Sequence, residues 1–256
     1  MTDHVEQYQA LDLTRYNTAM RHIWPWPSIL IEEVASRLKQ IPGKHWLDAA
    51  CGEGQLADLS GMEKQLVGLD LDRQRLLRAR KRPYQATVQG SVTSLPFADA
   101  SFDGIATIET LEHIPDIDTA LKEFARCLKD GGYLLVTVPS VTLRSLWQMM
   151  QLGIPVYCDS REHVREFSPV PIHGFPHRFK TWAWLETTAS RQGFHLVRQG
   201  GVGYLFPMCT RKLAWLEHAM NLLYRERINR IFGRVPVIRY FCYYLICLFR
   251  LGTARE

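Results

Sequence analysis

Several common signals are missing from this 256-residue sequence. Its six cysteines form no CxxC pair, which indicates reduced cytosolic thiols and not a disulfide framework. Its first ten residues, MTDHVEQYQA, contain no apolar run and no basic cluster, so we expect no secretory signal and a cytoplasmic location. The sequence also has no internal repeat and no low-complexity linker, which favours one domain with helical extensions at both ends.

A convincing metal-ligand pattern is missing as well. His173 and His177 are four residues apart, but Pro176 between them is incompatible with presentation on one helix face. His163 and Cys158 are scattered, and no further cysteine completes a zinc set. We therefore predict no metal site.

Charge is unevenly distributed along the chain, whose formal net charge is +5. Residues 1–210 contain 22 Lys/Arg and 23 Asp/Glu, whereas residues 211–256 contain nine Lys/Arg and three Glu. The basic excess therefore belongs to the tail. It indicates either an anionic partner surface, such as a membrane or a nucleic acid, or a solvated helix face.

Short apolar runs alternate with helical patterns through the middle of the chain, which predicts a mostly parallel sheet covered on both faces. The expected strands are residues 44–50, 65–71, 86–89, 102–108, 133–138, 194–198 and 202–206. The expected helices between and after them are residues 55–60, 72–82, 116–128 and 182–191.

This alternation sets the expected domain boundaries. Residues 1–43 form an N-terminal helical extension, interrupted by prolines at the segment WPWP. Residues 44–210 form the α/β domain, with an insertion near 141–180. Residues 211–256 form a C-terminal helical extension that is both basic and apolar.

The segment WLDAACGEGQLADLS, Trp46–Ser60, places Gly52 and Gly54 directly after the first expected strand. Glycine is costly in regular structure, so this pair predicts a tight turn that a ligand approaches closely. Asp70 ends the next strand, where a carboxylate can accept hydrogen bonds from a ribose diol. Ala57 replaces the third glycine of a dinucleotide fingerprint and no GK[ST] follows, so a nucleoside without a pyrophosphate fits better.

Five ordered motifs carry a resemblance over roughly residues 44–140: DAACGEG, VGLDLD, GSVTSLPFADASFD, IETLEHIPD and LKDGGYLLVTVPS. Together they resemble the class I S-adenosylmethionine-dependent methyltransferases, and among these the small-molecule enzymes that include those of quinone biosynthesis. The resemblance implies a Rossmann-like, doubly wound, seven-stranded and mostly parallel sheet. It also implies S-adenosylmethionine as the methyl donor.

The resemblance assigns a cofactor role to each matching residue. Asp48 would hold the glycine turn and the methionine ammonium region, Asp70 the ribose, and Leu71 the adenine face. Ser91 and Val92 fall where the group usually has an acid beside the adenine amino group. A serine there accepts without charge assistance, so the sequence leaves open whether Asp99 or Asp103 serves instead. The implied cofactor residues are Asp48, Gly52, Gly54, Asp70, Leu71, Ser91, Val92, Ile108 and Glu109.

Methyl transfer requires alignment of the reacting atoms, and a general base only if the acceptor must lose a proton. Glu109, Glu112 and His113 are the candidates at the end of the fourth strand, with His113 and Glu109 as the predicted catalytic pair. The alternatives are that His113 caps the loop before Pro115 and that Glu112 is a surface residue.

The segment REHVREFS, residues 161–168, resembles a lid that closes over the substrate in related methyltransferases. His163 and Phe167 would face the acceptor, and Arg161 and Arg165 would bind an anionic group. An ordinary helix start is the alternative, although its like charges four residues apart would be unfavourable.

The tail contains YFCYYLICLF, Tyr240–Phe249, ten apolar or aromatic residues flanked by Arg239 and Arg250. A spanning helix needs about 20 residues, so we expect residues 236–250 either to lie on the inner face of a membrane or to pack on the domain or a second copy as a homodimer contact.

The first hypothesis is a methyltransferase for a small, lipophilic or membrane-associated acceptor. The second is an RNA methyltransferase that uses the basic tail, although the sequence has no RNA-binding module or NPPY-type motif. The third is a regulatory protein that binds the cofactor without catalysis, which the serine at position 91 keeps open.

Overall fold

The computed structural model describes residues 26–61, 65–139, 182–202, 242 and 244–253. The chain divides into two compact units. One comprises residues 1–30, 139–181 and 199–245, and most of it lies outside the described residues. The other comprises residues 31–138, 182–198 and 246–256, and it contains all of the site discussed below.

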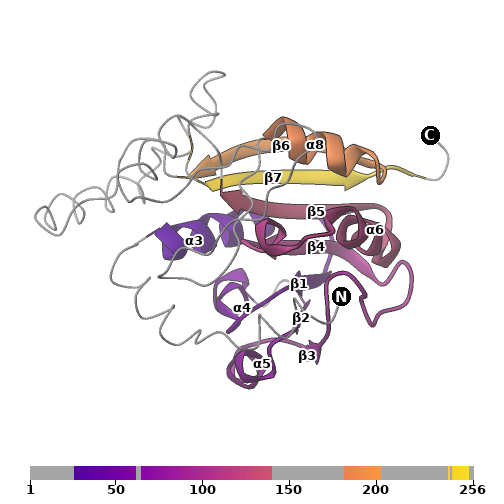
Figure 1. The fold of residues 1–256 in the computed structure, drawn as a ribbon. Helices are drawn as coiled ribbons and strands as arrows, with labels where there is room; N and C mark the ends of the chain where they lie inside the picture. The colour runs from indigo at the N-terminus through magenta and orange to yellow at the C-terminus, as the bar shows by residue number, and fades with distance from the viewer. Residues whose placement is uncertain (1–25, 62–64, 140–181, 203–241, 243, 254–256) are drawn as a thin grey trace, which may run out of the picture. The chain divides into compact units, whose positions relative to one another are not determined.

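Seven strands form one sheet in the order β3-β2-β1-β4-β5-β7-β6 (Figure 1). The strands are β1 His45–Ala49, β2 Gln65–Asp70, β3 Ala86–Gln89, β4 Phe102–Ile108, β5 Leu128–Pro139, β6 Phe194–Val202 and β7 Tyr244–Leu251. Neighbours from β3 to β5 pair in parallel. This confirms the predicted Rossmann-like fold and places the reversal of strand order between β1 and β4.

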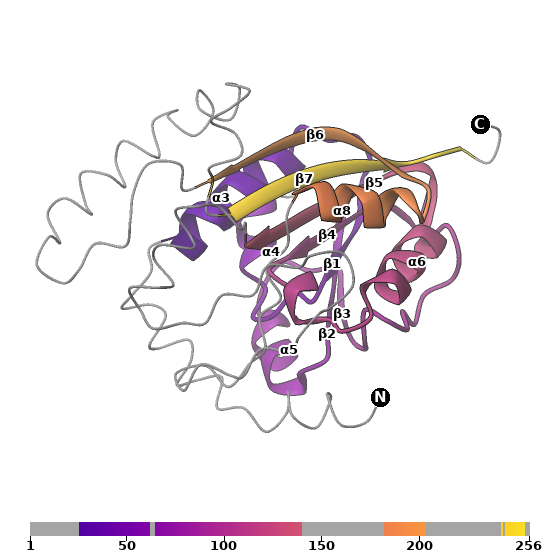
Figure 2. The same cartoon turned by 45° about the horizontal axis from the view of Figure 1, so that its top comes forward.

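Helices follow the strands as the sequence pattern predicts. They are α3 Trp26–Leu38, α4 Gln55–Ser60, α5 Arg73–Ala79, α6 Ile117–Cys127 and α8 Trp182–Ser190, with a 3₁₀ turn η1 at Leu111–His113. Asp72 and Asp116 cap α5 and α6 through their side chains. Figure 2 shows α4 and α5 on one face of the sheet and α6 with α8 on the other, so the central strands are covered on both sides.

The core explains one glycine in the middle of the sheet. Trp46 in β1 is completely buried, and a Cβ on Gly104 in the neighbouring strand β4 would lie 2.4 Å from its ring. Gly104 therefore makes room for the indole at the centre of the domain.

Two expectations for the end of the chain are wrong. The run Tyr240–Phe249 was expected as a helix in an extension, but residues 244–251 are strand β7, inserted between β5 and β6. A continuous apolar run is typical of a strand that is buried on both faces, and Tyr244–Cys247 are indeed buried. The described part of the tail therefore belongs to the sheet.

The closing strands also differ from the expectation of two short pieces at 194–198 and 202–206. The structure has one strand, β6, through residue 202, and residues 203–206 lie outside the described residues. Within β6, a Cβ on Gly201 would lie 2.3 Å from the carbonyl oxygen of Tyr244. Gly201 therefore permits close approach of β7 and does not end the strand.

Candidate active site

The candidate site lies at the carboxyl ends of β1, β2 and β4. Asp48 in β1 is paired in register with Gly68 in β2 and with Ala106 in β4. Open parallel sheets bind ligands at this edge, where the strand order reverses. The fold therefore brings the glycine turn, Asp70 and the Glu109 segment to one place, as the sequence predicted.

Left-handed backbone conformations gather at this edge. Ala50, which follows β1, has φ 66°, and Glu109, which follows β4, has φ 51°. Side-chain-bearing residues rarely adopt such angles, and they persist where the surrounding structure imposes them, commonly at functional sites. The two central strands thus both end in constrained backbone next to the predicted ligand.

Asp70 holds the glycine turn. Its Oδ2 accepts a hydrogen bond from the amide of Gly52 at 2.8 Å, and its Oδ1 accepts one from the amide of Asp72 at 2.8 Å. The resemblance assigned the turn to Asp48, so this contact differs from the expectation. Each carboxylate oxygen has a second lone pair, and the ribose role of Asp70 stays a prediction.

Asp48 is bound by a residue that the sequence analysis did not identify. The hydroxyl of Tyr84 donates to Asp48 Oδ2 at 2.5 Å. Burial raises the pKa of Asp48 to about 7, with the Tyr84 bond opposing the rise and the charge of Asp70 adding to it. Nothing in the local sequence signals this contact, because the two residues are 36 positions apart.

Asp70 has a raised pKa for related reasons. Burial is the largest cause, and the amides of Asp72 and Gly52 and the charge of Arg75 oppose it. Asp48 and Asp70 are 2% and 3% exposed, so this edge places two acids in a poorly solvated environment. Such an environment favours a cationic ligand.

Two glycines of the turn have different surroundings. Among the residues that the structure describes, the atom nearest to a Cβ on Gly52 would be Arg75 Nη1, at 3.7 Å, whereas a Cβ on Gly54 would lie 2.8 Å from Tyr84 Cε2. Gly52 therefore fits the predicted close approach of a ligand. Gly54 instead makes room for the ring of Tyr84. Packing within the protein therefore explains this glycine without a ligand.

The expected adenine side begins at Leu71, which is half-buried and accepts a hydrogen bond from Gln89 through its carbonyl oxygen. Ser91 Oγ lies 2.8 Å from Thr93 Oγ1 and accepts from the Thr93 amide, and Val92 is buried. The Ser91 hydroxyl thus closes a local turn. Its contact with an adenine stays a prediction.

Both alternative acids, Asp99 and Asp103, are bound by other residues of the chain. Asp99 pairs with Arg126 at 2.7 Å. Asp103 is the second residue of β4. Its carboxylate accepts hydrogen bonds from the amides of Lys44 and His45 at the start of β1, at the end of the strands opposite to the candidate site. Burial would raise the pKa of Asp103, but Lys129 and these amides lower it to about 2.

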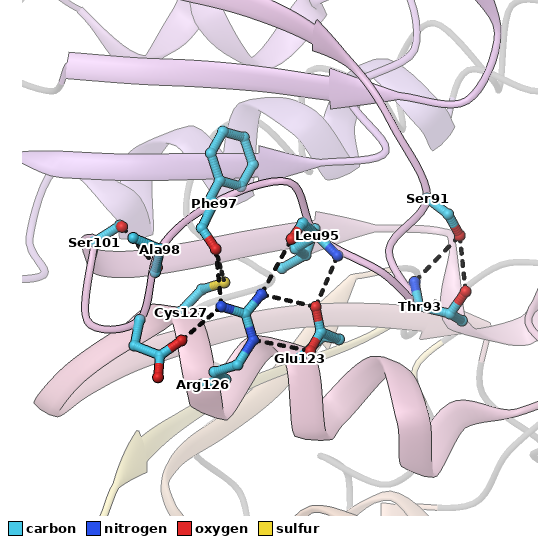
Figure 3. A network of polar contacts seen from close by, with 10 residues as sticks. Ser91, Thr93, Leu95, Phe97, Ala98, Ser101, Glu123, Arg126 and Cys127 are labelled. Atoms are coloured by element: carbon cyan, nitrogen blue, oxygen red, sulfur yellow. Dashed lines mark hydrogen bonds and ion pairs between the residues drawn. The ribbon is translucent and has the colours of Figure 1, made fainter.

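Arg126 on α6 fixes the segment that follows β3 (Figure 3). Its guanidinium donates to the carbonyl oxygens of Phe97 at 2.8 Å and Leu95 at 3.1 Å. Glu123 holds the guanidinium and also accepts from the Leu95 amide at 2.8 Å. The loop that carries Ser91 is therefore anchored to a helix, a contact that sequence reasoning missed.

Glu109 and Glu112 lie at the end of β4. Thr137 in β5 binds Glu109 twice, since its hydroxyl donates to Oε1 at 3.1 Å and accepts from the Glu109 amide at 3.0 Å. Burial and the neighbouring Glu112 raise the pKa of Glu109 well above its usual range. Burial raises the pKa of Glu112 to about 8, although a bond from Glu109 lowers it in part.

Glu112 is not a surface residue, so that alternative is wrong: it is 1% exposed. Its Oε2 has no hydrogen-bond partner within the described residues. His113 lies beside it, with Nε2 3.8 Å from Glu112 Oε1, and its amide closes η1 on Thr110. The structure therefore brings Glu109, Glu112 and His113 together, with Glu112 buried and with Glu109 and His113 half-buried.

The remaining site expectations concern other segments. His163, Arg165 and Phe167 lie outside the described residues, as does most of the tail that precedes β7. Ile108 ends β4 and is half-buried. Across the ranges that the structure describes, no group of three metal-ligating side chains occurs and no helix has the length and apolarity to cross a membrane.

Comparison with known proteins identifies the class of domain at this site. Residues 47–136 match the family model described as a methyltransferase domain. An O-methyltransferase of Aspergillus sclerotiorum is 36% identical over 118 residues, which are 42% of this chain and 44% of that protein. A demethylmenaquinone methyltransferase of Desulfitobacterium hafniense is 34% identical over 105 residues, 37% of this chain and 42% of that protein. The chain thus spans less than half the length of both relatives.

A solved structure shares the fold. The S-adenosylmethionine-dependent methyltransferase of Thermotoga maritima, described as a possible histamine N-methyltransferase, aligns with a TM-score of 0.63 at 16% identity. It covers 98% of this chain and 99% of its own. Residues 47–136 are therefore similar to a methyltransferase domain, and the fold is the one that the resemblance implies.

Proposed function

We propose that the protein transfers the methyl group of S-adenosylmethionine to a small-molecule acceptor. The observation that carries this proposal is the pair of buried acids, Asp48 and Asp70, beside the glycine turn at the switch point of the sheet. S-adenosylmethionine carries a sulfonium and an ammonium group, so its charge complements this edge. When bound, it supplies the electrophilic methyl group.

The residues of the chain would then divide the work. Asp70 would bind the ribose while it holds Gly52, and Gly52 would let the ligand lie against backbone. The Glu109–Glu112 pair would accept the proton of a hydroxyl acceptor, because buried carboxyls with raised pKa values are effective bases near neutral pH. The relatives named as O-methyltransferases support an oxygen acceptor.

Two finer parts of the proposal rest on sequence alone. A lipophilic or membrane-associated acceptor is supported by the relative named for demethylmenaquinone, whereas the apolar run of the tail forms strand β7 and gives it no support. His163, Arg165 and Phe167 would form the lid over that acceptor. Methylation of RNA is the weaker candidate, because the apolar part of the tail contributes a strand to the sheet.

Calorimetric titration with S-adenosylmethionine and S-adenosylhomocysteine tests the proposal. We expect micromolar binding by the wild type and at least tenfold weaker binding by Asp70→Asn, which removes one charge and one backbone contact. Asp99→Asn is the matched control, because it removes the same charge from an exposed acid that pairs with Arg126. No binding by the folded wild type would refute the proposed function.

A further inference from the structure

Tyr84 reaches the end of β1 from a position just before β3. Its ring packs on a cluster formed by Cys51, Leu76 and Ala79. A Cβ on Gly68 in β2 would lie 3.1 Å from the ring, and a Cβ on Gly54 would lie 2.8 Å from it. Two glycines on different elements therefore make room for one aromatic side chain.

The hydroxyl of Tyr84 is directed at one atom, Oδ2 of Asp48, at 2.5 Å. Burial, followed by the charges of Asp48 and Cys51, raises the pKa of Tyr84 far above its ordinary value, so the hydroxyl stays protonated and remains a donor. Hydrogen bonds to a charged acceptor are short and strong, and this one fixes the orientation of the carboxylate.

The hydrogen-bond partner of Asp48 is a neutral hydroxyl, which does not cancel the negative charge of the ionised carboxylate. The influences on Asp48 are its burial, the Tyr84 hydroxyl and the negative charge of Asp70, and none of these is a cation. A lysine or arginine at the position of Tyr84 would cancel the negative charge. A tyrosine holds the carboxylate in place and leaves the charge for a ligand.

We propose that Tyr84 is a positioning residue that orients Asp48 to receive the cationic aminoacyl end of S-adenosylmethionine. This inference rests on the proposed function and adds a residue outside the five sequence motifs. The adenosine part of the ligand would depend on Asp70 and its neighbours, and it would not depend on Tyr84. Loss of the hydroxyl should therefore weaken only ligands that carry the ammonium group.

The experiment compares two ligands on Tyr84→Phe. S-adenosylhomocysteine carries the aminoacyl group, whereas 5′-methylthioadenosine has the same adenosine and a thioether without it. We expect the Kd of S-adenosylhomocysteine to rise about tenfold, in the range for loss of a hydrogen bond to a charged group. The Kd of 5′-methylthioadenosine should change less than twofold. Tyr133→Phe in β5 is the matched control and should change neither value.

A pH series gives a second readout on the same variant. Asp48 faces Tyr84, Asp70 and Cys51, and the Tyr84 bond lowers its pKa. Affinity for S-adenosylhomocysteine should fall as the pH is lowered and Asp48 is protonated. Without the Tyr84 donor, this fall should occur at a higher pH than in the wild type. A merely structural effect would weaken both ligands equally and leave this pH unchanged.

The outcomes separate the two proposals. If the folded wild type binds neither ligand, the proposed function is wrong and the role of Tyr84 is refuted with it. If the wild type binds S-adenosylhomocysteine and Tyr84→Phe binds it equally well, or with an unchanged pH midpoint, only the inference on Tyr84 is overturned.

Discussion

The ends of β2 and β4 both carry buried acids, but the chain satisfies them to different degrees. Both oxygens of Asp70 accept backbone amides at 2.8 Å. At the end of β4, Oε2 of Glu112 is buried with no partner among the described residues, and Glu109 shares its environment with that second carboxyl. The β2 side is therefore organised before any ligand binds, whereas the β4 side retains bonding capacity for one.

This difference suggests a division of roles. A preorganised acid suits a ligand that every reaction uses, such as the methyl donor. Buried carboxyls with raised pKa values suit proton transfer from an acceptor. The predictions below test this contrast.

The largest effect is expected at Glu112. Glu112→Gln keeps the shape of the side chain and removes its basicity, so we expect turnover of a hydroxyl acceptor to fall roughly 10²- to 10⁴-fold. Binding of S-adenosylhomocysteine should change less than threefold. The measurement pairs steady-state kinetics with calorimetry, and Glu186→Gln on α8 is the control. Equal loss of binding and turnover would contradict the division of roles.

The next effect is on stability and comes from Asp48. Its pKa is about 7 in the folded protein against 3.8 for an ordinary aspartate. Between these values the folded state binds a proton that the unfolded state has lost, so stability falls as pH rises through this window and the full cost is present above pH 7. Asp48→Asn removes this cost, which is at most about 4 kcal/mol.

We therefore expect Asp48→Asn without ligand to unfold at a higher temperature than the wild type at pH 8. The advantage should shrink as the pH falls and disappear near pH 3, below both pKa values, where both states of the wild type are largely protonated. Thermal unfolding at several pH values measures this, and the same variant should bind S-adenosylhomocysteine more weakly. A pH-independent difference between the two proteins would refute the assignment.

Two glycine substitutions test how the turn is built. Gly54→Ala meets both an unfavourable φ of 87° and the Tyr84 ring at 2.8 Å, so we expect a loss of about 2–4 kcal/mol in stability. Gly52→Ala has φ 56° and a nearest side-chain atom at 3.7 Å, so its loss should be about 1–2 kcal/mol.

Ligand affinity should rank these glycines differently. A methyl group on Gly52 would occupy space that we assign to the ligand, so Gly52→Ala should weaken S-adenosylhomocysteine binding more than its loss of stability explains. Denaturant unfolding and calorimetry on both variants make the comparison. Equal stability losses would show that Tyr84 does not occupy the space beside Gly54.

Much of this structure could be predicted from the sequence, for physical reasons. Apolar runs alternate with helix patterns, and burial on both faces of a parallel sheet demands such runs, so β1 to β4 were predicted within one residue of their observed bounds. Strand β5 begins at Leu128, five residues before its expected start at 133. The glycine turn and Asp70 were predicted because positive φ and a strand-end acid leave direct traces in the sequence.

What could not be predicted depends on contacts between distant residues. The apolar run of β7 is equally compatible with a buried strand and a buried helix, and only its neighbours in the sheet decide. Tyr84 and Asp48 meet across β2 through the space that Gly68 leaves. The burial of Glu112 follows from the turn η1, which a charged residue after a strand does not by itself reveal.

The smallest effect is expected on the adenine side. Ser91 stands there at the position where related methyltransferases usually have an acidic residue. Its hydroxyl is already bound to Thr93, so it offers little to a ligand. Ser91→Asp would add a charged acceptor and could still accept the Thr93 amide, as aspartate does in turns. We expect the Kd of S-adenosylhomocysteine to fall about threefold.

Ser101→Asp, at an exposed turn on the same loop, controls for the added charge. Because Arg126 and Glu123 anchor this loop, a Ser91→Asp variant with unchanged affinity would mean that the anchored loop lies out of reach of the adenine, and the comparison of the two strand ends would then rest on Asp70 alone.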